Sequence, residues 1–243
     1  SSDLCSSDLE LAANVDSVSS RIAAACATAR RSASDLTLIA VTKTFPASDV
    51  ELLAELGITD IGENRDQEAA AKVAELSERW GEPAKLRLRW HFVGALQTNK
   101  CHSVVRYAAM VHSVDRPRVV HALSAAVADR SAPLRCLVQV NLDPAPQPGR
   151  AGARRAEVAG LADEIATAPG LVLAGVMGVA PLGDDPGQAF ADLAEVAAQV
   201  RQQYPEATVI SAGMSGDLEA AVANGATHLR VGAALLGSRG HPG

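Results

Sequence analysis

Strand-like and helix-like segments alternate along almost the whole chain, and this alternation constrains the fold more than any other feature. Short runs rich in Val, Ile and Leu, such as residues 36–41 and 134–142, are each followed by a longer stretch with the apolar spacing of a helix. The pattern occurs eight times. Alternation of this kind indicates a parallel sheet, and eight units in 243 residues favour a closed barrel over an open sheet. We therefore predict an α/β fold, a single-domain (β/α)8 TIM barrel, with an open doubly wound sheet as the alternative.

The expected elements follow one order, and one additional helix at residues 9–32 precedes the first strand. The expected strands cover residues 36–41, 59–64, 86–94, 110–114, 134–142, 171–179, 207–213 and 227–232. The helices that follow them cover residues 47–57, 65–80, 98 onward, 116–130, 153–168, 186–204, 215–225 and 233–237. The barrel domain is therefore expected to span residues 9–240, with an extra N-terminal helix. SSDL is repeated within the first nine residues, and residues 1–8 are predicted to be a disordered, processed or engineered tail.

Composition and charge exclude several classes of function. The net charge of -6 argues against a nucleic-acid surface, which needs clustered Lys and Arg. No apolar run reaches the roughly 18 residues that a membrane span needs, and no secretory signal is recognised, so we expect a cytoplasmic protein. The dispersed cysteines form no C-x-x-C pair and are expected to be reduced thiols, with no metal site: Cys5, Cys26, Cys101 and Cys136.

A lysine comes directly after the first expected strand. Lys43 lies in the stretch LIAVTKTFP, and the C-terminal ends of barrel strands face the ligand site. A single lysine at such a place is most often a solvated charge. Other strand ends also carry polar or adaptable side chains, however: Asn64, His91 and Met177. Side chains that converge from several strand ends indicate a binding site.

Two stretches near the C-terminus have the composition of a phosphate site. SAGMSGD, with Ser211, Gly213 and Ser215, precedes one expected helix, and RVGAALLG, with Gly232 and Ala233, opens the last one. Small residues let backbone N–H groups approach an anion, and serine adds a hydroxyl donor. Each stretch alone is also explained by a helix cap at Ser215 or by a tight turn. Their position after strands seven and eight, where such barrels often bind phosphate, favours the phosphate site.

A lysine and a phosphate site at the same end of a barrel indicate a phosphorylated carbonyl compound that is held as a Schiff base. Two ligand classes meet this description. One is a sugar phosphate bound by an aldolase without a cofactor, and the other is pyridoxal 5′-phosphate (PLP). The residues alone leave both open.

Several segments of the chain resemble a known family. They are AVTKT, GENRDQE, WHFVGALQTNK, VHSVDR, VQVNL, GVMGVAP and SAGMSGDLEAAVANGATHLRVGAALLG. In this order they resemble the pyridoxal phosphate homeostasis protein family, also called YggS-like, over about residues 9–240. The resemblance implies a fold-type III PLP-binding barrel that is similar to the N-terminal domain of alanine racemase.

The resemblance also implies roles for individual residues. Lys43 is implied to carry PLP as an internal aldimine, and Ser215, Gly232 and neighbouring backbone amides are implied to hold the phosphate. Arg230 is implied to point at the pyridine nitrogen. The ring pocket is implied to be lined by two further residues, Asn64 and Met177.

Some positions depart from the usual pattern of the family. Thr42 stands where serine is common, Arg65 where tyrosine is often found, and Ala212 where methionine is often found. The loop at residues 141–152 lacks the Glu and the Lys that the family usually carries before a glycine. A role for those two charges in closing the loop is therefore not expected in this chain.

The sequence favours a PLP carrier over an enzyme. A two-base racemase needs a second acid/base group, which alanine racemase takes from a tyrosine in a separate domain. Tyr107 and Tyr204 are expected on helices away from the strand ends, and His91 is expected to have a structural role inside the barrel. We therefore expect a PLP-binding protein that acts in intracellular PLP homeostasis, with no catalytic residues and with PLP-dependent apoenzymes as candidate recipients. A low-activity single-domain racemase or transaminase and a cofactor-free Schiff-base aldolase are the alternatives.

Overall fold

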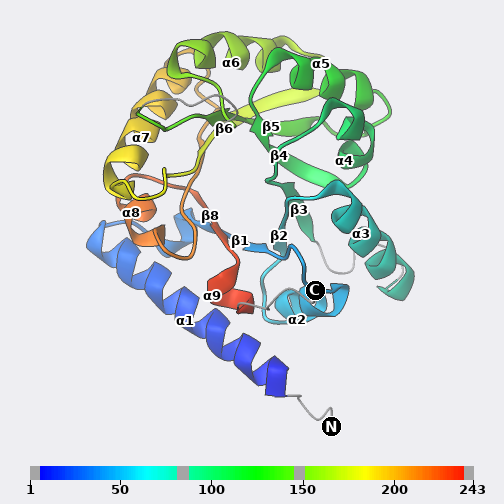
Figure 1. Cartoon of the computed structure of the whole chain (residues 1–243), viewed down its shortest axis with the longest axis vertical. Coiled ribbons are helices and arrows are strands. Elements are labelled where there is room, and N and C mark those ends of the chain that lie inside the picture. Colours follow the sequence, from blue (N-terminus) through cyan, green and yellow to red (C-terminus); the bar gives the residue numbers. More distant parts are fainter. Residues whose placement is uncertain (1–5, 81–87, 145–150, 238–243) are drawn as a thin grey trace.

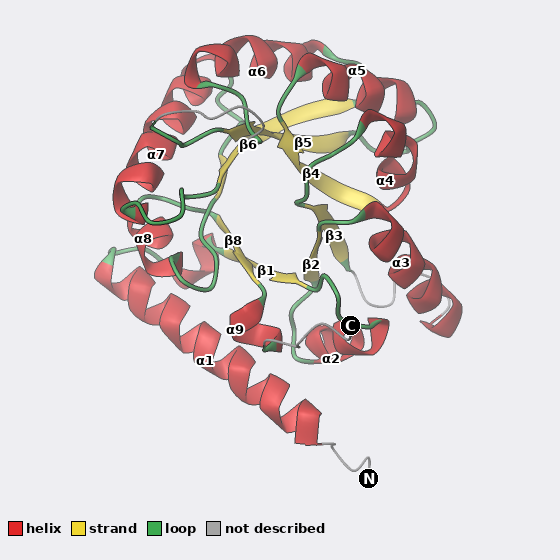
Figure 2. Ribbon diagram, in the orientation of Figure 1, coloured by secondary structure: helices red, strands yellow, loops and turns green. Residues whose placement is uncertain are grey.

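The computed structural model describes residues 6–80, 88–144 and 151–237. Its eight parallel strands form one closed barrel in sequence order, and the last strand pairs with the first. The predicted (β/α)8 barrel is therefore confirmed. Figure 1 and Figure 2 look into the ring of strands, with the helices arranged around its outside.

The elements follow the expected order. The strands are β1 (Thr37–Val41), β2 (Asp60–Glu63), β3 (Arg89–Phe92), β4 (Ala108–Val114), β5 (Leu134–Val140), β6 (Leu171–Gly178), β7 (Val209–Ser211) and β8 (His228–Val231). The α-helices are α1 (Ser6–Thr28), α2 (Ala47–Glu55), α3 (Asp66–Trp80), α4 (Cys101–Tyr107), α5 (Pro117–Ala126), α6 (Val158–Thr167), α7 (Pro186–Gln203), α8 (Leu218–Ala223) and α9 (Ala233–Leu236). Short 3₁₀ turns are η1 (Ala33–Asp35), η3 (Thr98–Lys100) and η4 (Arg155–Glu157).

The main core lies between the outside of the barrel and the ring of helices. Strand side chains such as Val111 and Val176 pack there with helix side chains such as Leu53, Leu123 and Leu193. Parallel strands are buried on both faces. Their sequences are therefore nearly continuous apolar runs and do not alternate between apolar and polar residues. The low aromatic content of 3% means that Ala, Val and Leu fill most of this layer.

The barrel interior is apolar on one side and polar on the other. Side chains from β4 to β7 form an apolar cluster that is separate from the main core: Met110, Leu137, Ala174, Met177 and Val209. Two residues beyond Met110 and Val209, on the same strand faces, stand the buried polar side chains of His112 and Ser211. The interior therefore combines a packed apolar half with a hydrogen-bonded polar half.

The extra helix α1 crosses the outside of the barrel next to α8 and α9 (Figure 1). Its apolar residues recur at intervals of three and four positions, which produces one buried stripe: Leu11, Val15, Val18, Ile22 and Ala25. Polar contacts fasten the helix at both ends of this stripe. Asn14 Nδ2 donates to the Leu235 carbonyl at 3.0 Å, and Arg31 Nη1 donates to the Val222 carbonyl at 2.8 Å.

Some element boundaries differ from the prediction. Helix α1 begins at Ser6, inside the stretch predicted to be a tail, and residues 1–5 lie outside the described structure. Strand β7 ends at Ser211 because Gly213 adopts a φ of 91° and turns the chain away from the sheet. The helix expected from residue 153 begins at Val158, after the 3₁₀ turn η4. Among the described residues, no helix combines the length and the apolar character needed to cross a membrane.

Candidate functional site

Lys43 lies in a tight turn directly after β1. The turn is closed by the Phe45 backbone N–H, which donates to the Thr42 carbonyl at 3.0 Å. The Lys43 side chain is exposed. Thr44 has a φ of 67°, an uncommon value for a β-branched residue, and its N–H donates to Glu68 Oε2 at 3.0 Å. A backbone outlier of this kind persists only where surrounding contacts hold it, and such outliers cluster at functional sites.

A buried ion pair holds the start of this turn. Lys72 of α3 donates to Glu63 Oε1 at 2.5 Å and to the Thr42 carbonyl at 2.6 Å, and Thr42 Oγ1 also donates to Glu63 Oε1 at 2.5 Å. Burial raises the pKa of Glu63, although Lys72 and Thr42 oppose this effect. Glu63 and Lys72 therefore fix the backbone of the residue that precedes Lys43. The sequence did not reveal this contact, because Lys72 reads as one charge on a polar helix face.

Arg230 lies inside the barrel near the ends of β6 and β7. It is 5% exposed, and it donates from Nη1 to Ser211 Oγ at 2.7 Å and from Nη2 to the Gly178 carbonyl at 2.9 Å. Burial lowers the pKa of Arg230 to about 10, so the guanidinium remains protonated at neutral pH. Two of its five N–H groups donate to these acceptors, and the other three have no protein acceptor among the described residues.

The two stretches predicted to hold phosphate lie side by side. Ser215 Oγ accepts a hydrogen bond from the Ala234 N–H at 3.1 Å, which joins the loop after β7 to the first turn of α9, where Gly232 and Ala233 stand. Gly213 cannot be replaced without strain, because a Cβ there would lie 2.6 Å from the Cβ of Ala221. Hydroxyl and backbone donors therefore converge between β7 and α9.

Helix α1 supports this pair of loops from outside. Arg21 Nη2 donates to the Ser215 carbonyl at 3.0 Å, and Arg21 also forms an ion pair with Glu219 at 2.8 Å. The carbonyl of Ser215 is thus fixed by a helix that stands before the first barrel strand. This contact joins residues 194 positions apart, and no local sequence pattern predicts it.

Asn64 follows β2 and lines a cavity of about 330 Å³. Other residues around this cavity include Arg65, Phe92, Leu96, Gln97 and Lys100. Asn64 Oδ1 is buried and has no hydrogen-bond partner among the described residues, a costly arrangement unless a ligand or water supplies one. Gly94 permits the close approach of the next loop, because a Cβ there would lie 2.1 Å from the Asn64 carbonyl oxygen.

Met177 and Ser211 occupy neighbouring positions on β6 and β7. Met177 is 1% exposed and belongs to the apolar half of the barrel interior. Ser211 is fully buried, and its hydroxyl contacts Arg230 and His112. Ser211 thus contacts Arg230 directly, and the loop that carries Gly213 and Ser215 begins beyond it.

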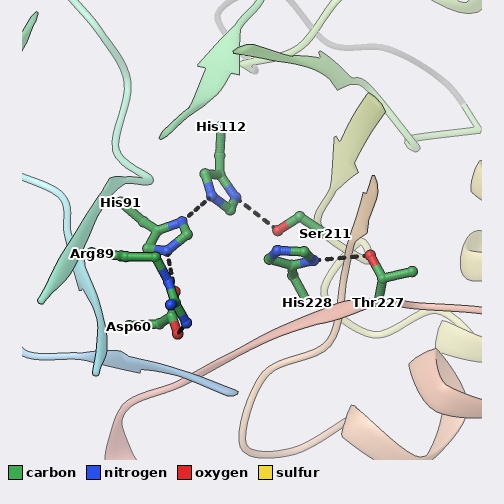
Figure 3. Close-up of polar contacts among 7 residues, drawn as sticks. All are labelled: Asp60, Arg89, His91, His112, Ser211, Thr227 and His228. Carbon is green, nitrogen blue, oxygen red and sulfur yellow. Dashed lines mark hydrogen bonds and ion pairs between the residues drawn. The ribbon is translucent and has the colours of Figure 1, made fainter. Parts of the chain in front are cut away.

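A row of polar side chains crosses the barrel interior, as Figure 3 shows. His91 Nε2 contacts Asp60 Oδ1 at 2.8 Å, and His91 Nδ1 contacts His112 Nε2 at 2.9 Å. His112 Nδ1 then contacts Ser211 Oγ at 2.8 Å. His91 was expected in the barrel interior, and it lies there with its two ring nitrogens in hydrogen bonds. The part played by His112 and Asp60 was missed, because single polar residues inside strand patterns do not reveal which face they occupy.

Comparison with known proteins places this arrangement in a family. The family model described as alanine racemase, N-terminal domain, matches residues 17–240. The pyridoxal phosphate homeostasis protein of Mycobacterium bovis is 43% identical over 244 aligned residues, which cover 95% of this chain and 93% of that protein. This chain belongs to the pyridoxal phosphate homeostasis protein family. The resemblance inferred from the sequence motifs is therefore confirmed.

Solved structures agree with membership of the pyridoxal phosphate homeostasis protein family. PipY of Synechococcus elongatus, solved with PLP bound, is 34% identical with a TM-score of 0.75 and covers 88% of this chain and 99% of its own. An unknown protein from Bifidobacterium adolescentis has a TM-score of 0.86 at 29% identity and covers 94% of this chain and 95% of its own.

The residues of this homeostasis-family barrel fit PLP chemically. A lysine amine stands at one strand end, and a buried cation with free N–H groups stands at another. The orphaned amide oxygen of Asn64 and the donors around Ser215 provide further polar contacts. The departures from the family pattern do not disturb this set. Thr42 still donates its hydroxyl to Glu63, Arg65 is exposed beside Glu68, and Ala212 is buried.

We expect the stability of the protein to depend on pH because of His228 in the barrel interior. Burial lowers the pKa of His228 to about 4, whereas an unfolded histidine titrates near 6.5. The unfolded chain therefore binds more protons between these values, and the free energy of unfolding falls as the pH drops from 7 to 4. At pH 5, His228 accounts for a loss of about 2 kcal/mol. His228→Asn should reduce the difference between urea unfolding at pH 7 and at pH 5 by about that amount.

The exposed His102 provides the control for this measurement. In His102→Asn, the free energy of unfolding should differ between pH 7 and pH 5 by the same amount as in the original protein. If His228→Asn showed the same pH dependence of the free energy of unfolding as the original protein, His228 would not be the neutral buried histidine that we expect.

Proposed function

We propose that this protein binds PLP and acts in intracellular PLP homeostasis. Its relatives carry the name pyridoxal phosphate homeostasis protein, and the PipY structure holds PLP. The observation that carries the proposal is the meeting of four parts at one barrel end: the Lys43 turn, the buried Arg230, the unpaired Asn64 oxygen and the Ser215 loop.

Each part has a proposed task toward the cofactor. Lys43 would hold PLP through condensation of its amine with the aldehyde, which releases water, and Arg230 would donate to the ring nitrogen. Asn64 and Met177 line the ring, and Ser211 supports Arg230. The phosphate is held by the loops after β7 and β8: Gly213, Ser215, Gly232 and Ala233. When bound, PLP supplies an aldehyde that reacts with amines and a ring that withdraws electrons.

The residues of the barrel fit a PLP carrier better than a PLP-dependent enzyme. Tyr107 donates to Asp66 at 3.4 Å and Tyr204 donates to Asp163 at 2.7 Å, so each described tyrosine hydroxyl is already hydrogen-bonded to a carboxylate. His91 uses its ring nitrogens inside the barrel. A positive Arg230 also disfavours protonation of the ring nitrogen, which weakens the ring as an electron acceptor. We propose transfer of PLP to apoenzymes in the cytoplasm as the physiological role.

An absorption spectrum of the purified protein tests the proposal against its alternatives. Lysine-bound PLP absorbs visible light, whereas the lysine of a cofactor-free aldolase does not. The chain has four lysines, Lys43, Lys72, Lys85 and Lys100, so borohydride reduction and peptide mapping identify the attachment point without ambiguity. A colourless protein that PLP does not convert to a coloured one would refute the proposal. Rapid turnover of an amino acid by the coloured protein would instead favour the racemase alternative.

Replacement of Ser215 tests the phosphate loops. Ser215→Ala removes one hydroxyl donor to a charged oxygen, so PLP binding should weaken by about 1.5–3 kcal/mol. Pyridoxal, which lacks the phosphate, should bind more weakly than PLP and should bind both variants equally. The measurement is a titration of each compound followed by visible absorption. Equal affinity of the original protein for PLP and pyridoxal would contradict a phosphate role for these loops.

A further inference from the structure

A continuous hydrogen-bonded row leads from Arg230 on β8 across the barrel interior to His112 on β4, and from there back to Asp60 on β2. We call it the histidine chain, and its members are Arg230, Ser211, His112, His91, Asp60 and Arg89. The residues come from β8, β7, β4, β3 and β2, so the chain crosses the interior instead of following one strand. Figure 3 shows its middle portion, with His112 between Ser211 and His91.

The carboxylate end fixes the direction of the hydrogen bonds. Asp60 accepts a hydrogen bond from Arg89 Nε at 2.7 Å. Burial alone would raise the pKa of Asp60, but the hydrogen bonds from His91 and Arg89 lower it. An ionised carboxylate only accepts, so His91 Nε2 carries a hydrogen. When the His91 ring carries only this one hydrogen, Nδ1 is an acceptor and His112 Nε2 donates to it.

The same reasoning continues to Ser211. His112 is fully buried, and burial lowers its pKa well below the ordinary value, so the ring is neutral. With its hydrogen on Nε2, its Nδ1 accepts and the Ser211 hydroxyl donates to it. Arg230 can only donate, so Ser211 Oγ accepts from the guanidinium. With one hydrogen on His91, every hydrogen between Arg230 and Asp60 points toward Asp60, and Arg89 donates to Asp60 from the other side.

We propose that His112 is a positioning residue that, through the Ser211 hydroxyl, holds the Arg230 guanidinium in the orientation that presents its remaining N–H groups to the ring nitrogen of PLP. The inference rests on the proposed function, since the ring nitrogen belongs to the cofactor. Without His112 the Ser211 hydroxyl is free to rotate. The Arg230 side chain then keeps one fixed acceptor, the Gly178 carbonyl, instead of two.

Nitrogen NMR of the unliganded protein with ¹⁵N-labelled histidine tests the chain without any cofactor. His91 and His112 should each show a protonated Nε2 and an unprotonated Nδ1 at neutral pH. His112→Asn identifies the His112 signals by their loss. A hydrogen on His112 Nδ1 would overturn the proposal, because the Ser211 hydroxyl would then not be committed to that ring.

The effect on the cofactor is measured with a PLP analogue that carries carbon in place of the ring nitrogen. The original protein should bind PLP at least about tenfold more tightly than this analogue, as expected for a hydrogen bond from a charged donor. His112→Leu should bring the ratio close to one. His112→Asn keeps an acceptor near the position of Nδ1 and should retain most of the preference. His228→Asn alters a neighbouring interior histidine outside the chain and should leave the ratio unchanged.

The ratio of the affinities for PLP and for the analogue tests the inference independently of the proposed function. Absence of PLP binding in the original protein would refute the proposed function, and the NMR result would still decide the state of the chain. PLP binding without preference over the analogue would leave the carrier role intact and overturn the inference. A full preference in His112→Leu would also overturn it. If His112→Leu does not fold, Ser211→Ala interrupts the same contact and should lower the ratio in the same way.

Discussion

Lys43→Ala should abolish the visible absorption that PLP produces on binding to the original protein. The chain has four lysines, and Lys43 is the one that directly follows a barrel strand at the ligand-binding end. Without its amine no covalent bond to the cofactor forms at this position, and borohydride should leave no PLP attached to the peptide. The phosphate loops remain, so the variant should still bind PLP weakly and reversibly. Absorption spectra and peptide mapping measure the two effects.

Lys100→Ala is the matched control for this result. Lys100 lines the cavity beside Asn64 and belongs to the same end of the barrel, yet the proposal gives it no covalent role. Its replacement should preserve the visible band. A Lys43→Ala protein that keeps the band, with the label found on Lys100 or Lys72, would refute the assignment of Lys43.

Lys72→Met should destabilise the protein by about 3–5 kcal/mol, because it leaves the buried carboxylate of Glu63 without its ion partner. Glu63 is fully buried and Lys72 is 7% exposed, so solvent cannot replace the lost charge. The Thr42 carbonyl also loses its donor, and the turn that carries Lys43 loosens. Urea unfolding at neutral pH measures the change in the free energy of unfolding.

Two comparisons decide whether the buried pair causes this loss. Arg79→Met removes an exposed ion pair of the same helix with Glu51 and should cost less than about 1 kcal/mol. The double variant Lys72→Met with Glu63→Leu removes the uncompensated charge and should recover much of the stability. A Lys72→Met protein as stable as the Arg79→Met protein would contradict the role of the buried pair.

The sequence allowed the barrel to be predicted, and it also singles out residues of the candidate site for a physical reason. Strands in a closed parallel barrel all end at the same rim, so residues that follow strands converge even when they are far apart in sequence. This reasoning singles out Lys43, Asn64 and Ser215 from the sequence alone. The motif resemblance then supplied Arg230, which pattern alone did not single out.

The supporting contacts were not predictable, because they depend on which way a side chain faces inside an element. His112 and Ser113 are consecutive in β4, and the register of this strand with its neighbours shifts at irregular positions. Sequence alternation therefore does not reveal that His112 meets His91 inside the barrel. Lys72 looks like a solvated helix charge until the fold brings Glu63 and the Thr42 carbonyl to it. Ser211 was grouped with the phosphate loop, whereas its hydroxyl lies between Arg230 and His112.

The position of α1 has a consequence for how the protein is synthesised. Its polar contacts to Ser215 and Leu235 join residues separated by 194 and 221 positions. The ribosome releases the N-terminal helix first and its partners last, so the apolar stripe of α1 stays uncovered during most of translation. Closure over such long separations is slow. The loops that we propose to hold the phosphate of PLP are therefore complete only once the residues around Leu235 have been synthesised and have met α1.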